Sequence, residues 1–325
     1  MRKRVIYVLL LFVVTTSLPS CKKESVSGHN NPQKPEPEEI IHYFSVSDNR
    51  KVLFSPGNLQ YQPSGHIWKF ADNQYDIIGS TNSNISSSYS GWIDLFGWGT
   101  SGRHVSGDTY NTCYAPTSSK NVYKPENNYN ATGYGPSMNM PDINLTGTSA
   151  VYDWGVDRTF MHRGTTINSQ WRTLSKEEWT YLLDTRSCKT VSGVPNARYA
   201  NIMVNYVRGL IVFPDNYVHP QGISNINPMD INGDKNEYEN THSTFSIQDW
   251  DKMEKQGAIF LPAGGFREGI EVKAVNTHEF YWTTTRINKG YSECVRFQSA
   301  VNRFSRIGCN YDGLSVRLVK DYCSN

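Results

Sequence analysis

Hydrophobic and polar residues alternate over most of the chain, and the alternation predicts a series of short strands. Residues 42–61 (HYFSVSDNRKVLFSPGNLQY) place apolar residues at alternate positions on both sides of a polar turn at 48–50, as two paired strands do. Residues 67–78 (IWKFADNQYDII) repeat this pattern and predict another strand pair. Residues 91–102 (GWIDLFGWGTSG) combine aromatic residues with glycines, which let the backbone and the rings approach closely.

Two segments carry the signals of a helix instead. Residues 175–183 (SKEEWTYLL) begin with a capping box of serine and glutamate and continue with an apolar stripe at helical spacing. Residues 246–257 (SIQDWDKMEKQG) begin with a capping serine, carry Trp250 and Met253 on one face, and end at a glycine. Between the strands and the helices, 103–150 predicts a long loop of the kind that is often functional.

The beginning of the chain has a different character. A basic start and a short apolar run over 1–20 predict a signal peptide, because the run is too short to span a bilayer. Residues 18–21 (LPSC) resemble the lipobox of bacterial lipoproteins, so Cys21 is the expected lipidation site, and a secretory signal with a chance cysteine is the alternative. Residues 21–40 are polar and proline-rich and predict a disordered tether, and 41–325 are expected to form a single domain.

Charge and composition narrow the classes of partner. The net charge is +2 and no block of Lys or Arg occurs outside the signal, which argues against nucleic acid. The membrane is an expected partner through the lipid on Cys21. Lys22 stands where some lipoproteins carry the aspartate of inner-membrane retention, so the sequence favours a lipid-anchored protein of the outer membrane. Aromatic residues make up 13%, which suits ligand contact through rigid rings and equally suits a β-rich exported protein.

Several segments in the second half of the chain match a known pattern in order. They are WRTLSKEEWTYLLDTR (171–186), GAIFLPAGGFR (257–267), FYWTTT (280–285) and GLSVRLVK (313–320). Together with YDWGV (152–156), they resemble bacterial proteins of the formylglycine-generating-enzyme-like group, or sulfatase-modifying factors. The resemblance implies an α+β, C-type-lectin-like fold with two helices, small antiparallel sheets and long loops. Some members of this group oxidise thiols or sulfur compounds at a metal, and others only hold a ligand.

The enzyme alternative depends on a pair of cysteines. Members of the group that are oxidases bind copper with two close cysteines, and the nearest candidates here are Cys294 and Cys309, although neither lies in a copy of the family's cysteine segment. Two buried cysteines or a disulfide are the alternatives. With Cys21 lipidated, an odd number of the six cysteines remains, so at least one thiol should be unpaired. The eight histidines include no HxxxH pair of the kind that binds iron in related sulfoxide synthases.

A second metal is suggested by oxygen-bearing side chains at alternate positions, which can turn several oxygens onto one calcium ion. The segment departs from an EF-hand loop, because Lys235 occupies the position of the glycine. A solvated acidic turn is therefore the alternative to a structural calcium site. The candidate calcium ligands are Asp230, Asn232, Asp234 and Asn236.

A ligand face is expected between Trp282 and Gly313, where Arg, Asn, Tyr, Ser and Phe are mixed. The segment resembles the ligand-facing part of lectin-fold display proteins, and an ordinary hairpin with its loops would show the same mixture. The candidate ligand-binding residues are Arg286, Asn288, Tyr291, Asn302, Arg303, Phe304, Asn310 and Tyr311.

The function expected from these observations is non-catalytic binding of a glycan, peptide or protein ligand by an envelope lipoprotein, with no cofactor. A copper-dependent thiol oxidase and a structural subunit of a surface appendage or envelope complex remain as alternatives. Arg172, Arg267 and Arg317 are expected to be structural, with Asp153 and Glu178 as their ion-pair partners.

Overall fold

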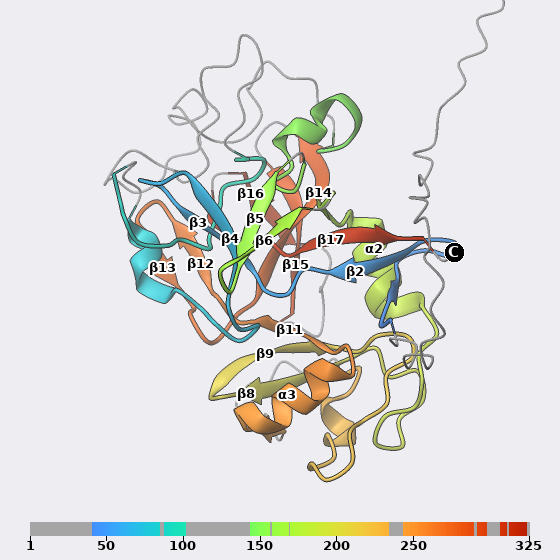
Figure 1. Cartoon of the computed structure of the whole chain (residues 1–325). Coiled ribbons are helices and arrows are strands. Elements are labelled where there is room, and N and C mark those ends of the chain that lie inside the picture. Colours follow the sequence, from blue (N-terminus) through green and yellow to red (C-terminus); the bar gives the residue numbers. More distant parts are fainter. Residues whose placement is uncertain are drawn as a thin grey trace, which may run out of the picture. The chain divides into compact units, whose positions relative to one another are not determined.

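The strands and helices of the fold are drawn in Figure 1 on a computed structural model of the chain. Residues Ile40–Tyr322 form one compact unit. For 306–309 the backbone alone is described. The residues that the structure describes are 41–84, 88–101, 144–156, 158–168, 170–233, 243–288, 291–297, 306–310 and 312–323.

The two ends of the compact unit meet in one antiparallel sheet. The predicted strand pair around the polar turn is confirmed, with Phe44 opposite Val52, and the last strand of the chain pairs with the second. Next to this sheet, the rings of Tyr43 and Tyr322 stack with their centroids 5.6 Å apart. In order across the sheet, the strands are β1 (Phe44–Ser45), β2 (Lys51–Phe54), β17 (Leu318–Tyr322) and β7 (Arg172–Thr173).

Strand β1 is fixed to the body of the unit by a carboxylate. Asp215 accepts hydrogen bonds from the backbone N–H of Ser45 at 3.1 Å and from its hydroxyl at 2.5 Å. The guanidinium of Arg186, which is fully buried, pairs with the same carboxylate at 2.7 Å. A strand of only two residues therefore has a buried ionic partner besides its hydrogen bonds to β2.

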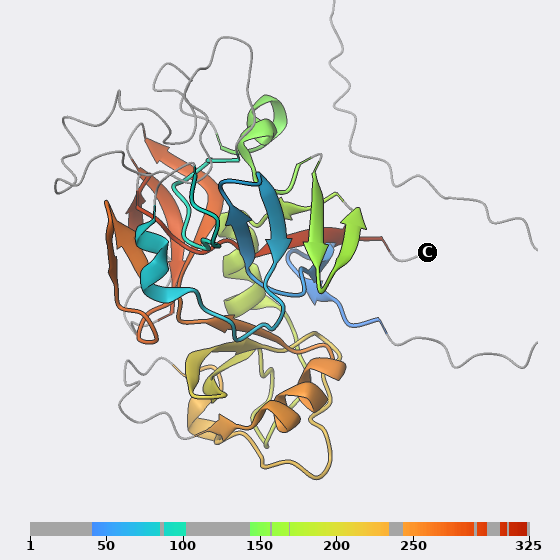
Figure 2. The same ribbon diagram turned by 60° about the vertical axis from the view of Figure 1, so that its left-hand side comes forward.

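A second sheet joins two hairpins that are far apart in the sequence (Figure 2). The prediction of a strand pair within 67–78 is wrong, because only 67–70 form a strand, and it pairs with the preceding segment and with a later strand. Beyond them the chain turns, since the carboxylate of Asp76 accepts from the N–H of Asn73 at 2.8 Å. In order across this sheet, the strands are β3 (Leu59–Gln62), β4 (Ile67–Phe70), β5 (Thr159–His162) and β6 (Thr165–Asn168).

The first predicted helix is confirmed with its capping box. Helix α2 (Lys176–Thr180) continues directly into a π-helical turn, η3 (Tyr181–Thr185). The hydroxyl of Ser175 accepts from the N–H of Glu178 at 3.2 Å, and the Glu178 carboxylate accepts from the N–H of Ser175 at 2.9 Å. The apolar stripe of this helix is buried, as its spacing predicts.

The second predicted helix, α3 (Ile247–Lys255), lies against a separate sheet (Figure 1). Ser246 caps it by accepting from the N–H of Asp249, and Trp250 and Met253 are buried, as predicted. Gly257 ends it with φ +80°, where an added Cβ would lie 2.1 Å from the Cβ of His42. In order across the sheet, the strands are β10 (Thr244–Phe245), β8 (Tyr199–Val204), β9 (Val207–Val212) and β11 (Ile259–Pro262).

Within the described residues, a three-stranded antiparallel sheet and a short hairpin complete the strands, and three short 3₁₀ helices lie in the loops. The three-stranded sheet consists of β14 (Phe280–Asn288), β15 (Tyr291–Arg296) and β16 (Arg306–Cys309). The hairpin consists of β12 (Phe266–Glu268) and β13 (Glu271–Lys273). The 3₁₀ helices are η1 (Gly79–Ser83), η2 (Gly147–Tyr152) and η4 (Pro228–Asp230).

The β14–β15–β16 sheet contributes to two hydrophobic cores through its alternating side chains. Trp282 and Cys294 are buried in one core with Trp98, while Val295 is buried in the other with Trp179 of α2. A further core lies between α3 and the β8–β9 hairpin. The fold is therefore α+β and rich in strands, as predicted at the level of fold class. Among the described residues, no helix is long and apolar enough to cross a membrane.

Candidate functional site

Part of the predicted ligand face comes together at one end of the β14–β15–β16 sheet. Arg286, which is half-buried, and Asn288, which is exposed, lie at the end of β14, and the register places Asn288 opposite Tyr291, the first residue of β15. Tyr291 in turn lies opposite Cys309, the last residue of β16, and Asn310 follows directly. The other predicted face residues, Asn302, Arg303, Phe304 and Tyr311, lie outside the described residues.

One side of this sheet end, which we call the Trp98 side, is built on a buried indole. The Arg286 guanidinium lies 5.8 Å from the centre of the Trp98 ring, a cation–π contact, and its backbone N–H donates to the side chain of Asn144 at 2.9 Å. Asn310 is buried. Its carbonyl accepts from the N–H of Trp98, and its side chain accepts from the Ser292 hydroxyl at 2.7 Å. These contacts connect the end of the sheet to the segments that carry Trp98 and Asn144.

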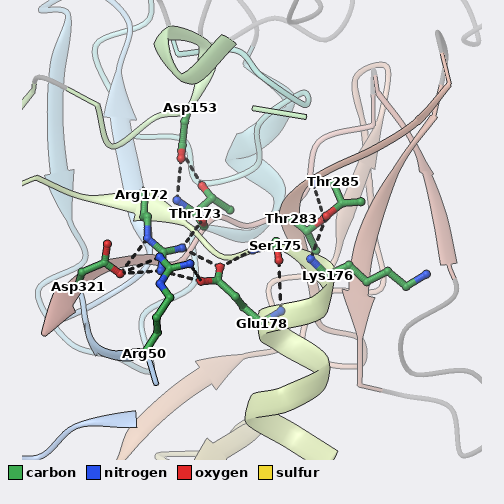
Figure 3. A network of polar contacts seen from close by, with 10 residues as sticks. All are labelled: Arg50, Asp153, Arg172, Thr173, Ser175, Lys176, Glu178, Thr283, Thr285 and Asp321. Atoms are coloured by element: carbon green, nitrogen blue, oxygen red, sulfur yellow. Dashed lines mark hydrogen bonds and ion pairs between the residues drawn. The ribbon is translucent and has the colours of Figure 1, made fainter. Parts of the chain in front are cut away.

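The opposite side, which we call the Lys176 side, faces the start of α2. The N–H of Lys176 donates to the Thr285 hydroxyl at 3.0 Å, which Figure 3 shows, and its ammonium pairs with Glu293 at 2.6 Å. Glu293 stands two residues after Tyr291 in β15, and side chains two apart lie on the same side of a strand. Asn288 is the cross-strand neighbour of Tyr291, so the Lys176 side gathers an ammonium, a carboxylate, a hydroxyl, a phenol and an amide.

A network of two arginines and two carboxylates, which we call the anchor network, lies beside the start of α2 (Figure 3). Arg172 of β7 forms a bidentate pair with Glu178 of α2 at 2.7 and 2.8 Å, and it also pairs with Asp321 of β17 at 2.8 Å. Arg50 contacts the same two carboxylates at 3.1 and 3.2 Å. The network therefore ties α2 to strands at both ends of the compact unit and so positions Lys176 at the first turn of α2.

The electrostatics of the anchor network favour its charged forms. Burial alone would raise the pKa of Asp321, but the hydrogen bond from Arg172 and the charges of Arg172 and Arg50 outweigh burial, so the pKa is lowered. Burial acts against the charge of Arg172 in the same way, and Glu178 and Asp321 outweigh it, so the pKa of Arg172 is raised. The predicted partnership of Arg172 with Glu178 is confirmed.

The role predicted for Asp153 needs correction. Its carboxylate accepts from the N–H of Thr173 at 2.8 Å and from the Thr173 hydroxyl at 2.7 Å, and it forms no ion pair with a described residue (Figure 3). Asp153 is 1% exposed, and burial raises the pKa of its carboxyl group. Asp153 fixes the backbone of β7 at Thr173, the residue after Arg172, which is a structural role.

The two other predicted structural arginines are buried among backbone and amide oxygens. Arg267 donates to the carbonyls of Gly269 and Leu95 at 3.0 and 3.1 Å. Arg317 donates to the side-chain oxygens of Asn58 and Gln74, and burial lowers the pKa of its guanidinium to about 10. Both are fully enclosed, as expected of residues that hold segments of the core together.

The two cysteines of the copper alternative lie on neighbouring strands but not opposite each other. Cys294 of β15 faces Arg306 of β16, and Cys309 faces Tyr291, so the two are three positions apart along the ladder. At about 3.3 Å per residue, this offset separates their backbones by about 10 Å along the strands. Elsewhere in the chain, Cys323 is disulfide-bonded and Cys188 has a free, half-buried thiol.

The described part of the candidate calcium segment already has protein partners. Asp230 ends η4, is 7% exposed and accepts from the Ser243 hydroxyl at 2.6 Å. Asn232 bonds to two backbone groups, the N–H of Arg198 and the carbonyl of Asn196, both at 2.9 Å. Asp234 and Asn236 lie outside the described residues. Within the described part of the chain, no three His, Cys, Asp or Glu side chains form a group that could hold a metal ion.

Sequence reasoning missed the residues that support the face from neighbouring segments. Trp98 and Asn144 belong to other parts of the chain, and nothing local in the sequence connects them with β14. Lys176 is hidden within a helix-start signal. Glu293 carries a recognisable signal, since it is an acidic residue inside the apolar strand YSECVR, where a partner is required. No protein-family model, no curated protein and no solved structure matches this chain.

Proposed function

We propose that the chain is an exported lipoprotein that binds a glycan, peptide or protein ligand, without catalysis, through the end of the β14–β15–β16 sheet. Cys21 would carry the lipid, and the segment after it would tether the domain to the envelope, with the outer membrane as the favoured location. The domain would belong to the formylglycine-generating-enzyme-like group and have its C-type-lectin-like fold. The order of α2, α3 and the strands that follow supports this assignment of the fold.

The observation that carries the proposal is that Arg286, Asn288, Tyr291 and Asn310 gather at one end of the sheet, the first and last on its Trp98 side and the other two on its Lys176 side. A recognition surface requires polar and aromatic groups held in place before the ligand arrives, because ordering them on binding costs affinity. The stacking of Arg286 on Trp98 and the buried hydrogen bond of Asn310 meet this requirement. Asn310 is buried and supports the surface, while the guanidinium of Arg286, the amide of Asn288 and the phenol of Tyr291 suit hydrogen bonding and stacking with a ligand.

The test is a binding screen of the full-length chain in detergent against arrays of glycans and of envelope peptides and proteins. For any ligand found, we expect the double variant Arg286→Ala/Asn288→Ala to weaken binding at least tenfold, because a hydrogen bond from the charged Arg286 alone is worth about 1.5–3 kcal/mol. The matched control is Arg163→Ala/Asn84→Ala, which removes the same two side-chain types at the β5–β6 turn and after η1.

Two results would contradict the proposal. One is that the double variant at the sheet end and its control bind the ligand equally well, which would place the binding surface elsewhere. The other is that the wild-type chain binds nothing on either array while it is folded, as judged by a cooperative unfolding transition.

A further inference from the structure

The Lys176–Glu293 pair has a property that the anchor network lacks. Oxygen Oε1 of Glu293 accepts from the Lys176 ammonium at 2.6 Å, but no described group donates to Oε2, which is buried. The whole residue is 9% exposed, and the hydroxyl of Thr283 fixes its backbone by donating to its carbonyl at 2.9 Å. Half of a charged group is thus enclosed without a hydrogen-bond donor.

Such an oxygen is costly, because an ionised carboxylate accepts up to about four hydrogen bonds and loses its hydration on burial. The neighbouring ammonium differs, since the side chain of Lys176 is 36% exposed and reaches solvent. The flexible four-carbon stem of Lys176 allows its ammonium to move away from Glu293, which would make Oε2 accessible to a ligand. A donor and an acceptor would then lie side by side at the surface.

This combination selects among ligand chemistries. A hydroxyl group fits it, because the hydroxyl donates its proton to Oε2 and accepts from the ammonium with its lone pairs. A cationic ligand group would meet the charge of Lys176, and an anionic one would meet the charge of Glu293. The Lys176 charge would therefore repel cationic ligands, and the Glu293 charge would repel anionic ones. A neutral polyhydroxyl compound is repelled by neither.

We infer that the Lys176–Glu293 pair binds hydroxyl groups of a neutral glycan at the Lys176 side of the sheet end. This inference rests on the proposed function and narrows its ligand to one class. The phenol ring of Tyr291 stands on the same side of β15 as Glu293, where a sugar ring can lie against it. The pair thus supplies the hydrogen bonds, and the aromatic ring supplies apolar contact.

The test uses the full-length chain in detergent, with an array of neutral, amino and uronic-acid glycans as the probe. Lys176→Met and Glu293→Gln keep the size of each side chain and remove its charge. We expect the wild-type chain to bind neutral glycans, and each variant to bind them about tenfold to a hundredfold more weakly. The double variant Lys176→Met/Glu293→Gln should lose binding and still fold, because removing both charges leaves none unpaired.

The matched controls are Lys273→Met and Glu268→Gln, which change the 2.6 Å ion pair of the β12–β13 hairpin and should bind as the wild type does. Each outcome decides the inference. An amine ligand would be lost in Glu293→Gln and bind more tightly in Lys176→Met, and a carboxylate ligand would do the reverse. Either pattern overturns the inference and leaves the proposed function intact, as does a neutral glycan whose binding ignores both variants. A chain that binds no ligand of any class overturns the proposed function as well.

Discussion

Asp94 is a carboxyl group enclosed in the loop that precedes Trp98, with 1% of its surface exposed. Its two oxygens accept from the side-chain amide of Asn82 at 2.7 Å and from the N–H of Ile78 at 3.2 Å. Burial is the larger influence on it, and it raises the pKa of Asp94 to about 6 against the hydrogen bonds. Asp94 therefore titrates in the folded protein at a pH where an exposed aspartate is already ionised.

The raised pKa gives a signed prediction for stability. The folded state holds the proton more tightly than the unfolded state, so the contribution of Asp94 is fully present below about pH 3.8 and is lost as the pH rises through about 6. A shift of this size corresponds to about 3 kcal/mol. Urea unfolding of the wild type and of Asp94→Asn between pH 4 and 7 should show their difference in unfolding free energy changing by up to this amount. A difference that stays constant with pH would refute the assignment.

Single residues also mark where sequence reasoning reached its limit. The pairing of Arg172 with Glu178 could be foreseen, because Arg172 precedes by only six residues the Glu178 of the capping box and buried charges need partners. The surroundings of Arg317 could not, because its partners Asn58 and Gln74 are more than two hundred residues away in the chain. A neutral partner at such a distance leaves no trace in local composition.

Among the secondary-structure elements, helix α2 is expected to be stabilised by its capping box. Ser175→Ala removes the acceptor for the N–H of Glu178, and the loss of such a cap costs about 0.5–2 kcal/mol. Urea unfolding should show this loss, and Ser64→Ala, an exposed serine in the β3–β4 turn, should leave the unfolding free energy unchanged. Equal stability of the two variants would mean that the box contributes nothing to the fold.

The elements were predictable where their signals are local. Both helices begin with capping residues and continue with apolar stripes, and both were found with their starts. The strand pair in 67–78 was mistaken because alternation identifies a strand without identifying its partner, and here the partner precedes it. The same limit applies to the sheet end, where cross-strand neighbours are set by a register that the sequence does not display.

At the scale of the whole molecule, the proposal of a lipoprotein gives a direct test. Cys21→Ser should move the protein from the membrane fraction to the soluble fraction and abolish labelling with a radioactive fatty acid, since only the cysteine can carry the lipid. Cys188→Ser, which removes a half-buried free thiol, should remain membrane-bound and labelled. A Cys21→Ser protein that stays in the membrane fraction would remove the basis for a lipid anchor.

The short strand β1 also determines how the molecule would bear mechanical force. In a chain anchored at Cys21, a pull on a bound ligand reaches the tether through β1, the first strand after it. The two residue pairs between β1 and β2 would separate easily under such a load. However, Ser45 also donates hydrogen bonds to Asp215, which forms an ion pair with the buried Arg186. In a chain anchored in this way, the contact of Ser45 with Asp215 would therefore help to set the force at which the domain begins to unfold from its anchored end.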